Sequence, residues 1–305
     1  MNKKNSIVLE MPFTRLLKRV VFIVFALTGF SVFSQNTVGF SQFGDTTFTI
    51  PTCVTSITAQ AWGASGAGGN NGGGGGGGGA YSSSILTVTP GTTYSLHIGE
   101  PGNQAQGAPN GVASWFGSTT TLYAEGGKGA SGATGGAGGL AANSVGNVKY
   151  SGGAGGNFSG NGGGGGGADA GPLGNGASGS NGNGTNGGLG GVGIGGQGSG
   201  GSGGNNNGGG SDNNYCSLCG GGGGSGSGGG NGGGGSMGNI IITLPDPIMA
   251  TVSNPQTICP GSSPLNYTAN ATGAYGPPCT YIWKSSVANS TSGFSTISGE
   301  TSQTY

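Results

Sequence analysis

The chain has 305 residues, of which 81 are glycine, and only 5% are charged. Glycine normally makes up about 7% of a protein, so an ordinary apolar core is excluded over much of this chain. The formal net charge is zero, but most of the basic residues precede residue 20, and the remainder has only three lysines. Because phosphate binding depends on Lys and Arg, we exclude nucleic acid as a partner.

The first 34 residues have the pattern of a signal peptide. Basic residues precede an apolar run over 20–33, and the small Ser34 then offers a cleavage point. A run of about 14 residues is shorter than the roughly 20 that a membrane span needs. We therefore expect residues 1–34 to be removed and the mature protein to be secreted without a transmembrane span. An uncleaved anchor is the alternative.

Short segments rich in Thr, Val, Ile and aromatic residues follow and predict an all-β fold with almost no helix. The predicted strands lie within 46–51, 54–63, 111–127 and 239–244. Residues 80–102 predict a hairpin with Pro90-Gly91 at its turn. We expect these strands, over 40–125 and 239–244, to bracket a glycine-rich block at 126–238.

Three states are conceivable for this block. Collagen is excluded, because the block contains a single proline, Pro172, and its glycine register slips. A flexible linker remains open. The third state is a bundle of extended polyglycine-II-type helices, with three residues per turn and hydrogen bonds between neighbouring backbones. In that bundle, GG-x units point Leu189 and Val192 outward, while residues 140–151 and 212–219 form turns between rods.

The C-terminal region predicts a second β domain. Residues 247–252 are interpreted as a linker, with prolines nearby. Residues 253–305 combine short strand patterns, Gly/Pro/Ser turns and a tryptophan in "TYIWKSS", which is typical of the start of a β-sandwich. A complete sandwich has about 100 residues, so we expect this domain to be incomplete.

Three segments carry a family resemblance: "TFTIPTCVTSITAQAWGASGAGG" (47–69), "GGGGAYSSSILTVTPGTTYSLHIGEPG" (76–102) and the closing "NIIITL". Together they resemble the glycine-rich domain of secreted bacterial surface proteins. Similar domains occur in phage tail-fibre tip adhesins and in anaplastic-lymphoma-kinase-type receptors. The resemblance implies that residues 37–246 form a β-sandwich carrying a bundle of polyglycine helices.

Residues 253–305 resemble an immunoglobulin-like or PKD-like repeat of large bacterial surface adhesins. The likeness rests on "PQTICPGSSPLNYTANATG", "YIWKSS" and "FSTISGETSQTY". Such adhesins usually end in a sorting domain for secretion across the outer membrane. The resemblance therefore implies outer-membrane attachment through a further C-terminal region.

The five cysteines do not make a disulfide framework. Cys216 and Cys219 lack both a second pair of zinc ligands and the βαβ context of a redox site, so a local disulfide or two free thiols remain. Cys259 and Cys279 either form a second bridge or stay reduced. Cys53 is then the odd cysteine, expected as a small buried hydrophobe.

The sequence shows no catalytic, cofactor-binding or metal-binding constellation. His97 is the only histidine, and without a nucleophile and an orienting group we expect a structural role for it. "GGGGADAGPL" at 164–173 is one incomplete copy of a calcium-binding nonapeptide, a type of site that needs tandem copies. The many GxGxxG matches arise from composition alone. We therefore expect no enzyme.

The sequence as a whole predicts a secreted, non-enzymatic adhesion or structural protein of the cell surface. Turns at the rod ends would contact a glycan or a cell-surface protein, and the candidate contact residues are Tyr150, Phe158, Asn214 and Tyr215. Alternatively, these aromatic residues cap the bundle or pack on the sandwich. The second hypothesis is a matrix or spacer protein without a specific ligand, and the third is an ice-binding protein.

Overall fold

The structure is a computed structural model. It describes residues 37–52, 54–104, 109–194, 198–213 and 218–245, together with four strands between 249 and 296. The predicted signal peptide lies outside the described residues and stays a prediction. Within the described part of the chain, no helix has the length and apolar character that crossing a membrane requires.

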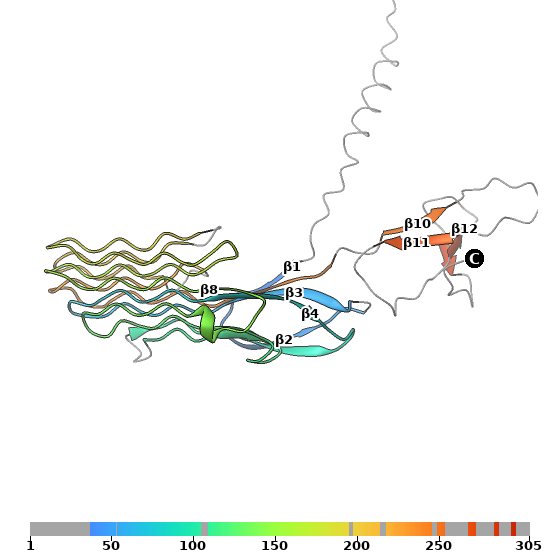
Figure 1. Ribbon diagram of the computed structural model, residues 1–305, viewed down its shortest axis with the longest axis horizontal. Helices are drawn as coiled ribbons and strands as arrows, with labels where there is room; N and C mark the ends of the chain where they lie inside the picture. Colours follow the sequence, from blue (N-terminus) through green and yellow to red (C-terminus); the bar gives the residue numbers. More distant parts are fainter. Residues whose placement is uncertain are drawn as a thin grey trace, which may run out of the picture. The chain divides into compact units, whose positions relative to one another are not determined.

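Two antiparallel sheets make up the β part of the glycine-rich domain (Figure 1), and the all-β prediction is confirmed. One sheet has the order β1-β9-β3-β4-β8, with strands Thr37–Phe40, Asn239–Thr243, Ser56–Trp62, Tyr81–Thr87 and Val148–Tyr150. The other has the order β2-β5-β6-β7, with strands Gly44–Thr49, Thr93–Ile98, Ser114–Phe116 and Leu122–Ala124. A 3₁₀ turn, η2 (Ala141–Asn143), lies between β7 and β8.

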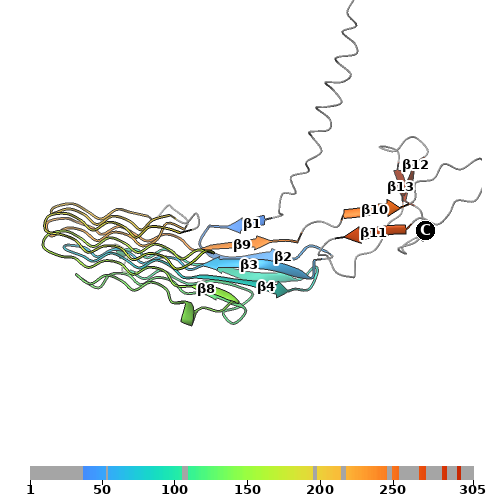
Figure 2. The ribbon, with the colours of Figure 1, turned by 45° about the horizontal axis from the view of Figure 1, so that its top comes forward.

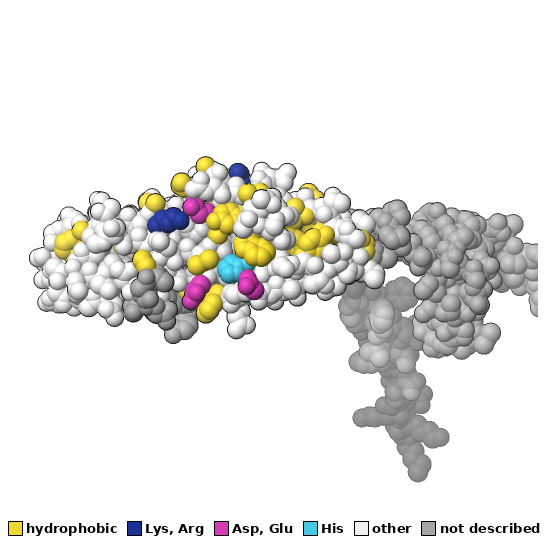
Figure 3. Space-filling model, turned by 90° about the horizontal axis from the view of Figure 1, so that it is seen from below, with side chains coloured by type: hydrophobic (Ala, Val, Ile, Leu, Met, Phe, Trp, Pro, Cys, Tyr) yellow, Lys and Arg dark blue, Asp and Glu magenta, His cyan; other side chains and the backbone are white. Residues whose placement is uncertain are grey.

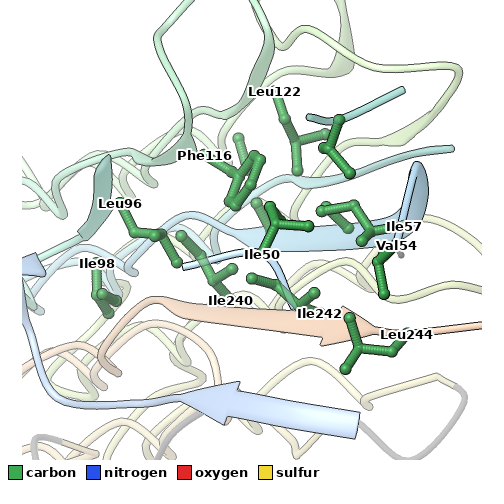
Figure 4. Close-up of a cluster of buried hydrophobic side chains, with 14 residues drawn as sticks. Ile50, Val54, Ile57, Leu96, Ile98, Phe116, Leu122, Ile240, Ile242 and Leu244 are labelled. Atoms are coloured by element: carbon green, nitrogen blue, oxygen red, sulfur yellow. The ribbon is translucent and has the colours of Figure 1, made fainter. Parts of the chain in front are cut away.

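The apolar core lies between the two sheets (Figure 4). Side chains alternate across a strand, so every second residue of a half-buried strand faces the core. In β9, Ile240 and Ile242 are fully buried, and the second sheet contributes Leu96, Phe116 and Leu122. Each large apolar side chain buried in this way stabilises the fold by about 1.5–3 kcal/mol.

The turn predicted at Pro90-Gly91 is confirmed, but the hairpin is wrong. Gly91 has a φ of 75°, and the N–H of Thr92 donates to the carbonyl of Thr89 at 3.1 Å. The strands on either side belong to different sheets, since β4 pairs with β3 and β5 pairs with β2. The chain also changes sheets between β2 and β3, and the two crossings are joined where Gly91 N–H donates to the Ile50 carbonyl. Strands β4 and β5, although in different sheets, thereby each bury one face in the same core.

Glycine-rich segments extend from one end of the sandwich as rods lying side by side (Figures 1 and 2). The first two rods, over 63–69 and 73–80, run between β3 and β4, so the bundle begins well before the predicted block at 126–238. Inside that predicted block, Val148–Tyr150 forms strand β8 against β4. Local composition does not reveal this strand, because its short sequence follows no clear alternation.

Hydrogen bonding in the bundle repeats every three residues. Along 75–78, successive N–H groups donate to different neighbouring segments, and the fourth returns to the segment that the first one used. The acceptors in order are the carbonyl oxygens of Gly156, Gly222, Lys128 and Gly153, at 2.8 to 2.9 Å. A β-strand alternates with a period of two, whereas three residues per turn is the period of a polyproline II helix. The rods are therefore held by backbone hydrogen bonds in several directions.

Close backbone packing explains why the inner rods consist of glycine. A Cβ atom added to Gly76 would lie 2.1 Å from the carbonyl oxygen of Gly66, which no side chain can accommodate. Rods at the edge of the bundle have one open side, and there the sequence follows a GG-x pattern. Leu189 and Val192 are 70% and 68% exposed, which confirms that they point outward.

The C-terminal region is described only at two strand pairs. β10 (Met249–Ser253) pairs with β11 (Thr268–Thr272), and β12 (Lys284–Ser286) pairs with β13 (Phe294–Thr296). Residues 247–252 were predicted as a linker. Strand β10 covers most of them, because its residues pair with β11. The immunoglobulin-like or PKD-like assignment of 253–305 stays a prediction.

Candidate functional site

Tight turns join the rods at the end farthest from the sheets (Figure 1). We call these the distal turns, and each lies between a rod that leaves the sheets and a rod that returns. They comprise residues 70–73, 131–134, 159–162, 183–186, 205–208 and 226–230. Most of their residues are exposed to solvent.

Glycine at one position determines the geometry of several distal turns. In Ser131–Thr134, Ser159–Gly162 and Asn183–Asn186, the first and last residues exchange backbone hydrogen bonds of 2.9 to 3.1 Å. The second residue is glycine each time, with φ of 57°, 65° and 61°. A positive φ at the first central position alone is the type II′ pattern, which glycine adopts at no steric cost. These turns are therefore closed and well defined.

The distal turns form one continuous, uncharged surface. Their exposed polar side chains are Asn, Ser and Thr only: Asn71, Ser131, Thr134, Ser159, Asn161, Asn183, Thr185, Asn186, Asn205, Asn206, Asn207 and Ser227. Neighbouring turns are bonded to each other, since Asn206 N–H donates to the Thr185 carbonyl at 2.9 Å and Ser227 Oγ donates to Asn206 Oδ1 at 2.8 Å. The surface thus has a fixed shape and many hydrogen-bonding groups.

Phe158 is the one predicted contact residue that the structure places beside the distal turns. It precedes the turn at 159–162 and is half-buried, because its ring covers Gly72 of a neighbouring distal turn. The distal turns themselves were not predicted from the sequence. For three of them the signal was present as a glycine in the second position of a short turn that begins with Ser or Asn, at 131–134, 159–162 and 183–186.

Tyr150 lies at the opposite end of the rods, in strand β8 and not in a turn. Its ring is stacked on Tyr81 with centroids 6.3 Å apart, and it packs beside a small cluster that includes Trp62 and Ala170. The structure therefore separates Tyr150 from Phe158. Asn214 and Tyr215 lie outside the described residues, so their predicted contacts stay predictions.

Residues 140–147 form a connection that hydrogen bonds to Ser84, Tyr123 and Glu125 hold against the sheets. Glu125 accepts hydrogen bonds from the Leu140 N–H at 2.8 Å and from Asn143 Nδ2 at 3.1 Å, and Lys128 lies 3.3 Å away. Burial raises the pKa of Glu125, but these bonds and the lysine charge outweigh it, so the pKa lies below its usual value. The segment predicted as a rod-end turn is thus fixed to β7.

A second carboxylate, Asp169, is fully buried where the rods meet the sheets. It accepts hydrogen bonds from Ser65 Oγ, from the Gly79 N–H at 2.6 Å and from Ser236 Oγ at 3.0 Å. These donors come from three different rods, and the backbone of Gly220 adds a fourth. Asp169 therefore connects rods that are far apart in the sequence.

Among the described residues no Lys, Arg or His forms an ion pair with Asp169, and this affects its protonation. Burial raises its pKa from 3.8 to about 6, although the four hydrogen bonds act in the opposite direction. The carboxyl group has no exposed surface, so no substrate can reach it, and its role is structural. The sequence signal was that Asp169 is the only charged residue between Lys149 and Asp212.

The remaining candidates are a metal site and the predicted disulfides. Among the described residues, no group of three or more His, Cys, Asp or Glu side chains could hold a metal ion. Cys53, Cys216, Cys259 and Cys279 lie outside the described residues, so the predicted Cys216–Cys219 and Cys259–Cys279 bridges stay predictions.

The fold defines a class of protein in which a two-sheet β domain carries a hydrogen-bonded bundle of glycine-rich rods. Comparison with known families agrees: the profile described as a glycine-rich domain matches residues 40–245, and the chain belongs to that family. A domain of unknown function matches residues 248–305. No curated protein matches the chain significantly.

Proposed function

We propose that the protein is a secreted, non-enzymatic adhesion protein whose distal turns contact a ligand on a cell surface. The observation that carries the proposal is the continuous surface of distal turns, which is exposed, uncharged and bonded from turn to turn. Loops positioned by a rigid scaffold are where binding sites are most often found. The leader pattern supports export, and attachment would depend on a further C-terminal region.

The bundle supplies the rigid scaffold in this proposal. Its rods are polyglycine-II-type helices, as their three-residue hydrogen-bonding period supports. The rods are stabilised mainly through the backbone, with a few turn side chains such as Asn205 accepting from a rod N–H. Exposed side chains such as Thr185 are therefore available for recognition. A preorganised surface also loses little conformational entropy when it binds.

Side-chain chemistry indicates the kind of ligand. Asn, Ser and Thr donate and accept hydrogen bonds without charge, which suits a glycan or a neutral region of a cell-surface protein. Since no charged side chain occurs in the distal turns, binding should depend little on ionic strength. Phe158 supplies the nearest aromatic surface.

A structural spacer is the second candidate function. Asn, Ser and Gly also favour turns for purely local reasons, so the composition of the distal turns alone does not require a ligand. The spacer hypothesis predicts no saturable binding to glycans or cells.

The test compares two charged substitutions at opposite ends of the rods. Thr185→Glu places a carboxylate on an exposed distal turn, whereas Leu173→Glu places one on an exposed turn near the sheets, where Leu173 is 74% exposed. Labelled full-length protein is applied to a glycan array and to intact cells. The adhesion proposal expects Thr185→Glu to lose binding and Leu173→Glu to keep it. Equal binding by both variants would contradict the distal site, and no binding by the unmodified protein would favour the spacer.

A further inference from the structure

A second candidate binding site lies on the outer face of the four-stranded sheet. The register pairs Asp45 with His97, His97 with Trp115 and Trp115 with Tyr123, so four side chains form one row across β2, β5, β6 and β7. Residues in register share a face of a sheet. The sequence neighbours of this row face the core, since Leu96, Phe116 and Leu122 are fully buried.

His97 holds two of its neighbours in place. Its Nδ1 lies 2.6 Å from Asp45 Oδ1, and its ring lies nearly parallel to that of Trp115, with centroids 5.8 Å apart and an interplanar angle of 13°. His97 is partly exposed, while Asp45 is 82% exposed and so remains accessible from solvent. The structural role expected for His97 therefore takes a specific form, which is to orient a carboxylate and an indole ring.

Beside this row is an open pocket of about 340 Å³. Its lining residues are Asp45, Thr46, Thr47, Ser95, Leu96 and Trp115. Gly117 directly follows β6 and lies where the row of Thr47 and Ser95 would continue, since its N–H donates to the Ser95 carbonyl. Figure 3 shows the single histidine at the surface of this face, with acidic and hydrophobic side chains next to it.

The pocket combines one aromatic side with a polar rim. Trp115 supplies a flat apolar surface, whereas Asp45 supplies a charged acceptor and Thr47 and Ser95 supply hydroxyl groups. A pyranose ring has matching chemistry, because one flat side presents C–H groups and its edge carries hydroxyls. The volume is at the low end of the roughly 300–1,000 Å³ typical of small-molecule pockets, which suits one or two sugar rings.

We propose that this pocket, which we name the Trp115 pocket, binds a neutral pyranose sugar. Trp115 stacks on the ring, Asp45 accepts hydrogen bonds from its hydroxyls, and His97 is a positioning residue. The site lies on the sheet and not on the rods, so it is independent of the distal turns. A ligand with few atoms in an open pocket binds with a dissociation constant in the millimolar range.

The test uses the full chain labelled with ¹⁵N at its three tryptophans. The probes are the methyl glycosides of β-D-glucose, β-D-galactose and α-D-mannose, titrated to about 50 mM to cover millimolar affinity. The indole N–H signal of Trp115 is assigned from Trp115→Phe. We expect at least one probe to shift that signal saturably, while the signals of the other two tryptophans stay in place.

Two variants and one control complete the design. Asp45→Asn, at a mostly exposed position that should fold normally, removes the charged acceptor and is expected to weaken binding at least threefold. Trp115→Ala, followed by saturation-transfer NMR of the sugar, is expected to weaken it at least tenfold. Ile85→Ala removes a 75% exposed apolar side chain from the other sheet and should change nothing.

Two results with the sugars would overturn the proposal: no shift of the Trp115 signal with any of them, or equal affinity in Asp45→Asn. A shift of that signal that is larger with tetramethylammonium than with the sugars would also overturn it, because it would indicate a cation site. The distal-turn proposal is tested separately by Thr185→Glu. That variant should leave the Trp115 titration unchanged, so either proposal can fail without the other.

Discussion

The buried carboxyl group of Asp169 makes the stability of the protein depend on pH in an unusual direction. Its folded-state pKa of about 6 lies above the ordinary value of 3.8, because burial disfavours the charged form. The folded protein therefore keeps a proton on Asp169 that the unfolded chain has already lost. This contribution to stability is complete below pH 4 and is lost as the pH rises through about 6.

A difference of about 2 pKa units corresponds to about 3 kcal/mol, at 1.36 kcal/mol for each unit. Asp169→Asn is nearly isosteric and keeps an oxygen to accept from Ser65 and Gly79, but it does not titrate. We expect the unfolding free energy of the Asn variant, relative to the unmodified protein, to rise by about this amount between pH 4 and pH 7.

The assay is urea unfolding of both proteins at several pH values across that range. Other carboxylates also titrate there, but they are common to both proteins and cancel in the difference. None of the groups that hydrogen-bond to Asp169 is ionisable, so the comparison isolates its own proton. A difference in unfolding free energy that does not change between pH 4 and pH 7 would refute the assignment of a raised pKa to Asp169.

Three further predictions concern the rods and their connections. Gly76→Ala should destabilise the protein by at least ~2 kcal/mol more than Gly230→Ala in urea unfolding, because an added Cβ meets backbone at Gly76 and open space at Gly230; equal effects would contradict close rod packing. Amide hydrogen exchange over 73–79 should be slow, and random-coil rates there would mean that the rods are not hydrogen-bonded. Glu125→Ala should lower the unfolding free energy by about 1–2 kcal/mol and speed amide exchange at Leu140, whose N–H donates to Glu125. Lys128→Ala, which removes only the ion pair, should lower the unfolding free energy by less.

Strand existence was predictable, but the assignment of strands to sheets was not. Alternating β-branched residues located β2 to β7 and β9 to within a few residues, since each strand has one face in the core. Whether a turn such as Pro90-Gly91 makes a hairpin or crosses between sheets depends on partners elsewhere in the chain. β4 has β3 as its partner and β5 has β2, and nothing local encodes that choice.

The candidate site was harder to predict for a related reason. Glycine content indicated rods, but the neighbours of each rod depend on long-range packing. The sequence therefore does not tell at which end of the bundle a given turn lies. Tyr150 was therefore placed on a turn, although its ring packs on Tyr81 beside the sheets. The row from Asp45 to Tyr123 likewise requires the register of four strands, which the separate sequence segments do not contain.

The pairing of β1 with β9 determines how this domain would bear mechanical load. Thr37 pairs with Thr243 and Phe40 pairs with Ile240, so the chain enters and leaves the domain at the same end, away from the rods. Tension between the flanking segments would separate these two short strands one hydrogen-bonded pair at a time. The rods and distal turns lie outside this force path, as a side branch, and would keep their shape while the chain on either side is pulled.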